Sequence, residues 1–216
     1  MNPVVRAMTR NAVGLALFAL ITAGTIALTH GLTQDRIAKQ EARAESRALF
    51  QIVPETQHTN DLLSDTLTLP ATPALGLDQP ATAHLVRREG RVTGLILPVI
   101  APDGYSGDIN LLVGIDRSGD VLGVRVTRHQ ETPGLGDKIE TRKSDWVRDF
   151  AGKELGQPPA EEWTVAKDGG AFDQFTGATI TPRAVVHAVR EALVYFRSHR
   201  ETLLAGNAPT PTEETD

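Results

Sequence analysis

The chain has no cysteine among its 216 residues. This absence excludes thiolate nucleophiles, disulfides, cysteine-ligated iron–sulfur clusters, cysteine-containing zinc sites and the C-x-x-C-H attachment of c-type haem. If the protein carries electrons, groups other than sulfur must hold the carrier.

Aromatic residues and excess basic charge are also scarce. Aromatics make up 5% of the chain and the formal net charge is −5. Nucleic-acid binding normally needs a basic surface, and single strands also need aromatic rings for stacking, so this function is excluded. The six histidines form no H-x-x-x-H pair, so we expect no metal site. The P-loop motif and the G-x-S-x-G motif of serine hydrolases are missing too.

A long apolar run lies near the N-terminus. Residues 11–34 include no acidic, lysine or arginine side chain, and residues 12–28 are almost wholly apolar. About 20 helical residues cross a hydrocarbon layer of roughly 30 Å. A cleaved signal peptide has a shorter apolar region of about 7 to 15 residues and ends in small residues, unlike Leu28-Thr-His-Gly-Leu32 here. We therefore expect an uncleaved transmembrane anchor over residues 11–32.

The charges that flank this run predict its orientation. Arg6 and Arg10 precede it without any acidic residue, whereas Asp35 and Arg36 after it cancel. Because positive flanks stay on the cytoplasmic side, residues 1–10 are expected in the cytoplasm and the main domain in the periplasm.

The exported part is expected to have three regions. Residues 33–81 favour a helical stalk up to residue 50, followed by a linker or irregular covering segment. Residues 82–206 form the folded domain. Residues 207–216 are mostly proline, threonine and acid, which predicts a disordered tail.

The domain itself has the pattern of an α+β fold. Residues 84–100 and 109–127 each read as two apolar strands around a turn, at Glu89-Gly90 and at residues 117–120. Two such hairpins predict an antiparallel sheet. Residues 143–150 favour a short helix with Ser144 as N-cap. Residues 163–166 are a candidate for a further strand of the sheet.

A long amphipathic helix is expected at the end of the domain. Thr181 suits its N-cap and Pro182 its first position, and apolar residues then recur at three- and four-residue steps up to Gly206.

The segment before this helix, residues 173–182, carries several hydroxyls and a small backbone at Gly177 and Ala178. A helix N-terminus attracts anions because its first N–H groups are unpaired and its dipole is positive there. A phosphate ester on a threonine would be stabilised at this position. The alternative is that Thr176, Thr179 and Thr181 only cap the helix, and the residues alone leave both open.

Three motifs resemble those of a known family. Thr176-Gly-Ala-Thr179, preceded by Asp173, resembles the flavinylation motif of the FMN-binding domain. This domain is shared by the G subunit of the Rnf electron transport complex and the C subunit of the sodium-pumping NADH:quinone reductase. The stretches 129–139 (HQETPGLGDKI) and 104–107 (GYSG) are similar to segments of the same families. The resemblance runs from the anchor to about Leu204, and Gly134-Leu-Gly-Asp-Lys138 favours the Rnf protein.

The resemblance implies FMN joined through its phosphate to the hydroxyl of Thr179 by a dedicated flavin transferase, with Asp173, Thr176, Gly177 and Ala178 around the attachment. The loop after the second hairpin suits the flavin ring, because Gly134 lets backbone approach a planar group and Leu135 can lie on its face. The candidate contacts in this loop are Glu131, Thr132, Gly134, Leu135 and Lys138. The alternatives are a surface lysine for Lys138 and a water-facing strand-end acid for Glu131.

The expected function is that of a covalent-FMN electron relay in a bacterial inner-membrane complex that couples electron transfer between ferredoxin and NAD to ion movement. FMN passes single electrons and needs no cysteine ligand. The expected partners are the other subunits of the complex and, for maturation, the transferase, so the chain would not be an enzyme alone. Two rivals remain: a non-redox membrane-anchored adaptor or sensor, and an enzyme that binds FMN reversibly.

Overall fold

The computed structural model describes residues 3–210, and the chain divides into two units, Met1–Arg43 and Ala44–Asp216. The last six residues of the predicted tail lie outside the described residues.

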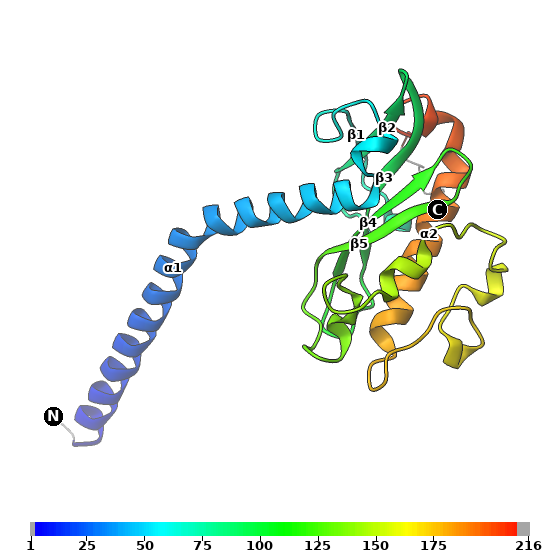
Figure 1. Ribbon diagram of the computed structural model, residues 1–216. Coiled ribbons are helices and arrows are strands. Elements are labelled where there is room, and N and C mark those ends of the chain that lie inside the picture. The colour runs from blue at the N-terminus through cyan, green and yellow to red at the C-terminus, as the bar shows by residue number, and fades with distance from the viewer. Residues whose placement is uncertain (1–2, 211–216) are drawn as a thin grey trace. The chain divides into compact units, whose positions relative to one another are not determined.

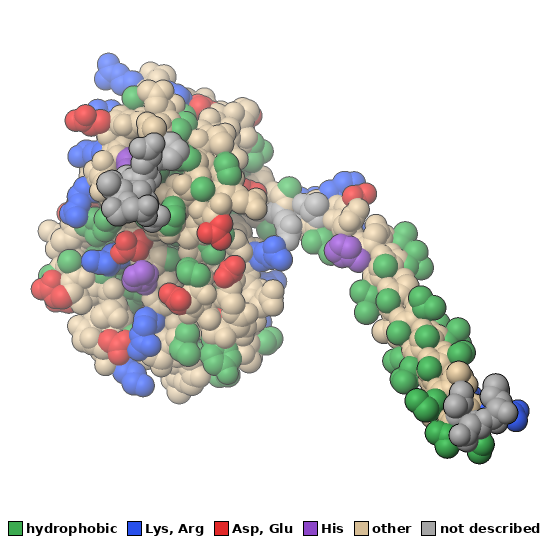
Figure 2. Space-filling view, turned by 180° about the vertical axis from the view of Figure 1, so that it is seen from behind, with side chains coloured by type: hydrophobic (Ala, Val, Ile, Leu, Met, Phe, Trp, Pro, Cys, Tyr) green, Lys and Arg blue, Asp and Glu red, His purple; other side chains and the backbone are tan. Residues whose placement is uncertain are grey.

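The described residues of the first unit belong to helix α1 (Pro3–Ile52), which continues into the second unit. From Arg6 to Ile52 this helix is long and apolar enough to cross a membrane, by length and composition. Figure 2 shows hydrophobic side chains along its outer part. The hydroxyls of Thr22, Thr25 and Thr29 donate to carbonyls four residues earlier, at 2.8 Å. Such back-bonding satisfies polar groups where no water is available.

The second unit contains a five-stranded antiparallel sheet with the strands in chain order (Figure 1). The strands are β1 (Thr66–Leu69), β2 (Ala81–Arg88), β3 (Arg91–Ala101), β4 (Ile109–Asp116) and β5 (Val121–Arg128). Both predicted hairpins are confirmed. Glu89 and Gly90 join β2 to β3 with φ of 52° and 77°, as a two-residue type I′ turn requires.

Strand β1 corrects the expectation for residues 53–80. This segment is not only loop: β1 pairs with β2 along the edge of the sheet. Leu62, Leu69, Leu75 and Leu77 of the segment are buried. A four-residue strand that ends before Pro70 has no clear period of its own, and only the pairing with β2 supplies its ladder hydrogen bonds.

Helices cover both faces of the sheet. Helix α2 (Ile180–Leu204) packs on the face that carries Leu95 and Leu97 of β3, whereas Ile96 on the other face packs with Leu49 and Ile52 at the end of α1. Alternate residues of a strand point to opposite faces, so β3 is apolar from Gly94 to Ala101 because both of its faces are covered there.

Hydrogen bonds from Arg125 cap the C-terminal end of helix α1. Arg125 of β5 donates from Nε to the side-chain oxygen of Gln51 (3.0 Å) and from Nη2 to its carbonyl (3.1 Å). The last carbonyls of a helix have no partner within the helix, so this arginine satisfies one of them. Burial lowers the pKa of Arg125, and repulsion from Arg148 adds to the effect.

Between β5 and α2 the chain is mostly irregular. The predicted helix at 143–150 is a 3-10 helix, Trp146–Phe150. Its N-cap is Asp145 and not the predicted Ser144, whose hydroxyl accepts the N–H of Trp146 (3.1 Å) from one position earlier. Residues 163–166 do not join the sheet, and Val165 makes an isolated bridge with Phe172 instead.

Aromatic packing holds this irregular region together. The Trp146 ring meets Phe150 and Phe175 edge-on, with centroids 5.4 and 5.1 Å apart, and Phe150 stacks on Phe172 at 4.6 Å. Edge-to-face and stacked pairs prefer these distances. The cluster therefore joins the 3-10 helix Trp146–Phe150 to Phe172 and Phe175, which lie at the start of the segment that leads into α2.

Helix α2 begins at Ile180, with Thr179 in the N-cap position, so the prediction of Thr181 as N-cap is wrong. Thr181 lies inside the first turn, and its hydroxyl binds Glu131, 50 residues earlier in the chain. A long-range partner therefore replaces the local capping role that the sequence favoured.

Candidate functional site

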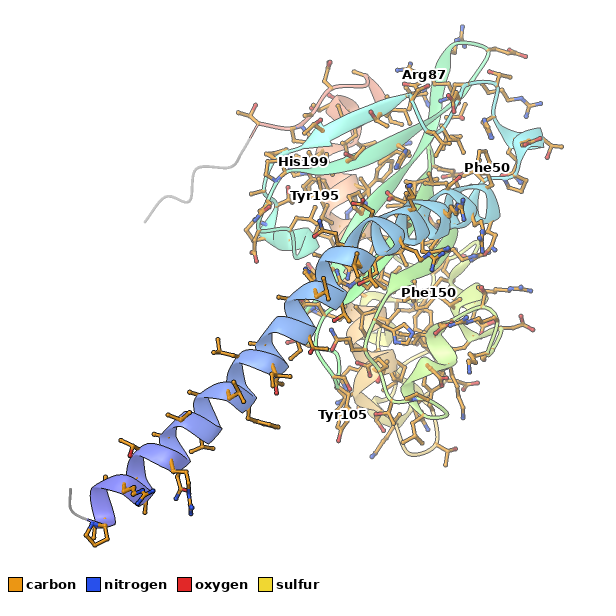
Figure 3. The ribbon with its side chains drawn as sticks, turned by 90° about the vertical axis from the view of Figure 1, so that its left-hand side faces the viewer. Phe50, Arg87, Tyr105, Phe150, Tyr195 and His199 are labelled. Carbon is orange, nitrogen blue, oxygen red and sulfur yellow. The ribbon has the colours of Figure 1, made fainter. Side chains whose placement is uncertain are left out.

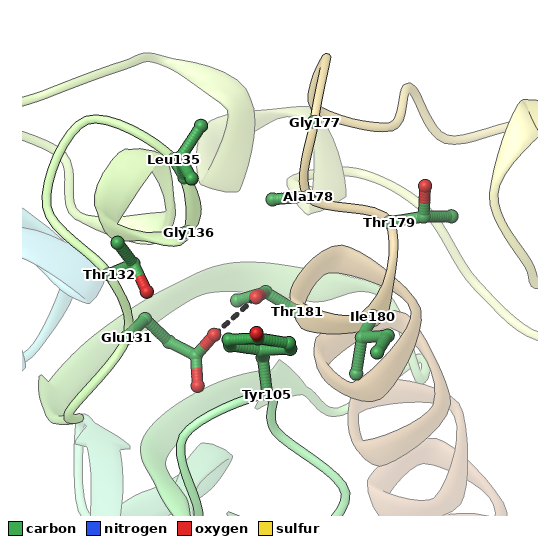
Figure 4. Close-up of a pocket in the computed structure, with 10 residues that line it drawn as sticks. All are labelled: Tyr105, Glu131, Thr132, Leu135, Gly136, Gly177, Ala178, Thr179, Ile180 and Thr181. Carbon is green, nitrogen blue, oxygen red and sulfur yellow. Dashed lines mark hydrogen bonds between the residues drawn. The ribbon is translucent and has the colours of Figure 1, made fainter.

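A cavity of about 300 Å³ lies where three segments meet: the loop from β3 to β4, the loop after β5, and the start of α2 (Figure 4). Its lining consists of Tyr105, Glu131, Thr132, Leu135, Gly136, Gly177, Ala178, Thr179, Ile180 and Thr181. In Figure 3, Tyr105 marks this end of the sheet and Arg87 the opposite end. The three segments are those that carry the motifs named above.

Glu131 joins these segments. One carboxylate oxygen accepts the N–H of Ser106 (2.9 Å) in the β3–β4 loop, and the other accepts the hydroxyl of Thr181 in α2. The side chain is buried, with Glu131 4% exposed. The alternative of a water-facing acid is therefore wrong, because the fold places hydrogen-bond donors from two other segments around it.

His129 and Glu140 support the same loop. The Nδ1 atom of His129 accepts the N–H of Glu131 (3.0 Å), so the proton of the neutral ring is on Nε2, which donates to Glu140 (2.9 Å). The Arg142 guanidinium lowers the pKa of the Glu140 carboxyl; burial opposes this effect, and the His129 hydrogen bond adds to it.

Two glycines are required by the packing around Glu131. A Cβ at Gly136 would lie 2.8 Å from a Glu131 carboxylate oxygen and 2.8 Å from the Thr181 hydroxyl. A Cβ at Gly104 would lie 2.2 Å from the carbonyl of Gly107 and 3.0 Å from the other Glu131 oxygen. Contacts this short are not tolerated, so the G-Y-S-G and P-G-L-G motifs supply the space that the buried carboxylate needs.

The loop after β5 is tightly closed by hydrogen bonds. The carbonyl of Thr132 accepts the N–H groups of Leu135 (3.1 Å) and Gly136 (3.0 Å). Asp137 accepts the N–H of Gly134 (2.8 Å) and pairs with Lys143 (3.2 Å). Burial raises the pKa of the Asp137 carboxyl, but the hydrogen bonds from Lys143 and Gly134 outweigh this effect, so the pKa is lowered overall.

Not every predicted site residue lines the cavity. Gly134, with φ of 79°, lies at the exposed turn of the loop, and the Lys138 ammonium is 5.9 Å from the centre of the Phe175 ring. Asp173 and Thr176 are exposed on the segment before α2. The carbonyl of Asp173 accepts the indole N–H of Trp146 (2.7 Å), which fixes this segment to the aromatic cluster.

The predicted attachment point, Thr179, follows a turn at Gly177. Gly177 takes φ of 84°, which glycine adopts without strain, and Ala178 and Thr179 follow it along the cavity. Figure 4 shows the Ala178 methyl pointing toward the Leu135 loop and the Thr179 side chain on the opposite side of the segment. The hydroxyl of Thr179 makes no capping hydrogen bond, so the interpretation of this threonine as a mere cap is not supported.

The cavity includes residues that the sequence reasoning did not assign to a site. Tyr105, Leu135 and Ile180 are the large apolar side chains of its rim, exposed by 68%, 41% and 45%; of these, only Leu135 was expected. Tyr105 stands between glycine and serine in a turn, a signal that could have marked it. Ile180 was expected before the helix and Thr181 as its N-cap; only the folded chain places Ile180 on the cavity lining and Thr181 beside Glu131.

Comparison with known proteins adds to this geometry. The FMN-binding domain model matches residues 104–194, a range that contains every residue of the cavity. A second model, the RnfG N-terminal region, matches residues 1–52, a range that contains α1. The chain thus has an FMN-binding domain preceded by an apolar helix.

The chain also matches relatives along most of their length. The chain is 52% identical to the G subunit of the ion-translocating oxidoreductase complex of Pseudomonas aeruginosa (strain UCBPP-PA14), an alignment that covers 93% of this chain and 94% of the relative. It is 50% identical to the G subunit of Vibrio vulnificus (strain YJ016), covering 92% and 93%. The chain belongs to this family, the RnfG subunits of ion-translocating oxidoreductase complexes. The resemblance to the Rnf protein is confirmed.

Proposed function

We propose that this chain relays electrons through FMN esterified to Thr179, as a subunit of a membrane-bound ion-translocating oxidoreductase complex. The observation that carries the proposal is the position of Thr179. This residue borders the cavity at the N-terminal end of α2, with its side chain on the side of the segment away from the Leu135 loop (Figure 4), and its hydroxyl is not used as a cap. A phosphate attached there is stabilised by the helix dipole and by unpaired N–H groups.

The cavity fits a flavin by size and chemistry. Small-molecule sites are concave and mostly apolar, with a few placed polar groups, and range from about 300 Å³ upward. Here Leu135, Ala178 and Ile180 supply apolar surface, and Thr132 supplies a hydroxyl. Glu131 and Thr181 would hold the walls of the site in place through their mutual hydrogen bond. The bound FMN would supply the electron transfer itself.

Attachment requires an activated flavin nucleotide and a transferase. The Thr179 oxygen forms a bond to the FMN phosphorus, and the bond from that phosphorus to a leaving group such as AMP breaks. The leaving group departs with the bonding electron pair, and the hydroxyl proton goes to a base. A tether of this kind keeps FMN on the protein where free FMN is too dilute to refill the site.

We further propose that α1 anchors the chain in the inner membrane with its N-terminus in the cytoplasm, because Arg6 and Arg10 precede the apolar run. The FMN domain is then periplasmic. In the complex, its FMN exchanges electrons with other redox subunits, and the overall reaction couples electron transfer between ferredoxin and NAD to ion movement.

Covalent attachment is tested on the full-length protein from membranes of a host that contains its flavin transferase. We expect a fluorescent band after denaturation and a mass greater than that of the sequence by one FMN less one water. Trypsin should release the peptide Asp168–Arg183, which contains Thr176, Thr179 and Thr181, so fragmentation must place the addition on Thr179.

Thr179→Val removes the ester oxygen but keeps the branched shape, and is expected to abolish covalent FMN with the fold intact. Thr202→Val, at an exposed threonine near the end of α2, is the matched control and should keep it. Covalent FMN in Thr179→Val would contradict the assignment. Flavin released by denaturation would instead indicate reversible binding, and absence of flavin in the unchanged protein would indicate an adaptor or sensor. Ferredoxin-dependent NAD reduction by membranes, lost in Thr179→Val, tests the proposed coupling.

A further inference from the structure

We propose that Arg183 binds the phosphate of the FMN attached at Thr179, and that Asp168 orients the Arg183 guanidinium for this contact. The inference rests on the proposed attachment at Thr179. Attachment of FMN changes the charge at this position, because the esterified phosphate carries one negative charge and the threonine hydroxyl carries none. A cationic side chain beside Thr179 can bind that charge.

Arg183 lies one helical turn after Thr179. Thr179 has helical backbone angles (φ −90°, ψ −28°), and its carbonyl accepts the N–H of Arg183 (3.3 Å). Residues four apart on a helix are surface neighbours, with Cβ atoms about 5–6 Å apart. The long arginine side chain therefore starts from the same face of α2 as the attachment point and can reach a group on the threonine oxygen.

The helix terminus by itself offers few donors to a phosphate. Pro182 has no N–H group, and the N–H of Arg183 already binds the carbonyl of Thr179. In the first turn, all of which is described, this leaves the backbone N–H groups of Ile180 and Thr181. A charged side chain is therefore needed to complete the binding of an anion at this helix end.

The guanidinium of Arg183 is held with one edge free. Its Nε and Nη2 atoms both bind one oxygen of Asp168, at 2.8 and 2.6 Å. Within residues 3–210 the Nη1 atom has no hydrogen-bond partner. The side chain is 47% exposed, so Nη1 is accessible to a ligand. Arginine binds phosphate well because its planar group presents several N–H donors in fixed directions.

Asp168 ends the short 3-10 helix Ala166–Asp168, and this turn holds it near Arg183. It precedes Gly169, which has φ of 86°, and the neighbouring Lys167 N–H binds the side-chain oxygen of Gln174 (3.1 Å). The turn is thereby tied to the segment that leads to Thr179. An exposed ion pair of this kind adds little to stability, so the pair is better explained by orientation of the guanidinium.

The test uses full-length protein in detergent with purified flavin transferase and flavin adenine dinucleotide. The variants are Arg183→Met, which removes the charge, Arg183→Lys, which restores it, and Asp168→Asn. Arg197→Met, an exposed arginine farther along α2, is the matched control. Equal thermal midpoints before modification establish that the variants are folded.

After modification, two measurements report on the phosphate: its ³¹P resonance and the fluorescence anisotropy of the attached flavin. We expect Arg183→Met to shift the resonance and lower the anisotropy, and to slow modification about two- to fivefold, the range for a partly exposed charge contact. Arg183→Lys should restore most of each effect, and Asp168→Asn should give intermediate values.

If Arg183→Met matches Arg197→Met in resonance, anisotropy and rate while the unchanged protein is fully modified, the inference is wrong and the proposed function stands. If Arg183→Lys behaves like Arg183→Met, charge is not the cause and the inference is also overturned. Failure of the unchanged protein to accept FMN would instead overturn the proposed function, and this inference with it.

Discussion

The hydroxyl of Thr181 donates a hydrogen bond to the buried carboxylate of Glu131, 50 residues earlier in the chain. The same carboxylate accepts the N–H of Ser106. One side chain thus ties the start of α2 to the β3–β4 loop and to the loop after β5, and these three segments form the wall of the candidate flavin site.

Glu131→Ala is expected to lower the free energy of unfolding by about 2 kcal/mol, because it leaves the Ser106 N–H and the Thr181 hydroxyl without their buried partner. FMN loading should fall at the same time. Urea unfolding of the full-length protein in detergent measures the first effect, and flavin absorbance per chain the second. Glu131→Gln, whose amide can still bind both groups, should lose less of each; equal losses would argue against the hydrogen-bonding role.

Gly136→Ala is expected to destabilise the protein by about 1–3 kcal/mol, since the added methyl would overlap Glu131 and Thr181. Gly134→Ala is the control in the same loop. It has φ of 79° but nothing within 4 Å of the added Cβ, so it carries only the backbone strain of about 1 kcal/mol. Thermal or urea unfolding compares the two, and a larger loss for Gly134→Ala would contradict the packing argument.

The hydrogen bonds of Asp137 should make stability fall with acid. Because its pKa is lowered in the folded protein, its contribution is fully present above the ordinary aspartate pKa of about 3.9. It is lost as pH falls through the lowered folded value. Asp137→Asn should therefore be less stable than the unchanged protein at pH 7, with the difference in stability closing as the pH falls below the ordinary aspartate pKa of about 3.9. Urea midpoints at several pH values measure this; a gap independent of pH would count against the ionised carboxyl.

Trp146→Phe is expected to cost about 1 kcal/mol beyond the lost packing, because the carbonyl of Asp173 loses its indole donor. It should also reduce flavin attachment, since the segment before Thr179 is less firmly held. Trp163→Phe is the matched control: its indole N–H is buried without a partner in the described part of the chain. Stability and FMN incorporation are measured for both, and equal incorporation would show that the Trp146 contact does not position the site.

Much of the candidate site could be found from sequence because its motifs are short, local and similar to those of the FMN-binding family. The loop with Glu131, Thr132 and Leu135 and the segment with Gly177 to Thr179 were both singled out, and the structure brings these residues to one cavity. Tyr105 and Ile180 were not, since exposure at a cavity rim depends on which distant segments come together.

By itself, the sequence determined the elements with strong local patterns: the apolar N-terminal helix, the two hairpins with their turns, and the long amphipathic helix at the end. In each of these elements, the apolar residues recur at a regular spacing that can be read from residues close together in the chain. Only the tertiary structure decided that β1 joins the sheet, that α2 begins at Ile180, and that Glu131 is buried. Those outcomes depend on partners far away in the chain, whose hydrogen bonds and packing outweigh the local preferences of the residues concerned.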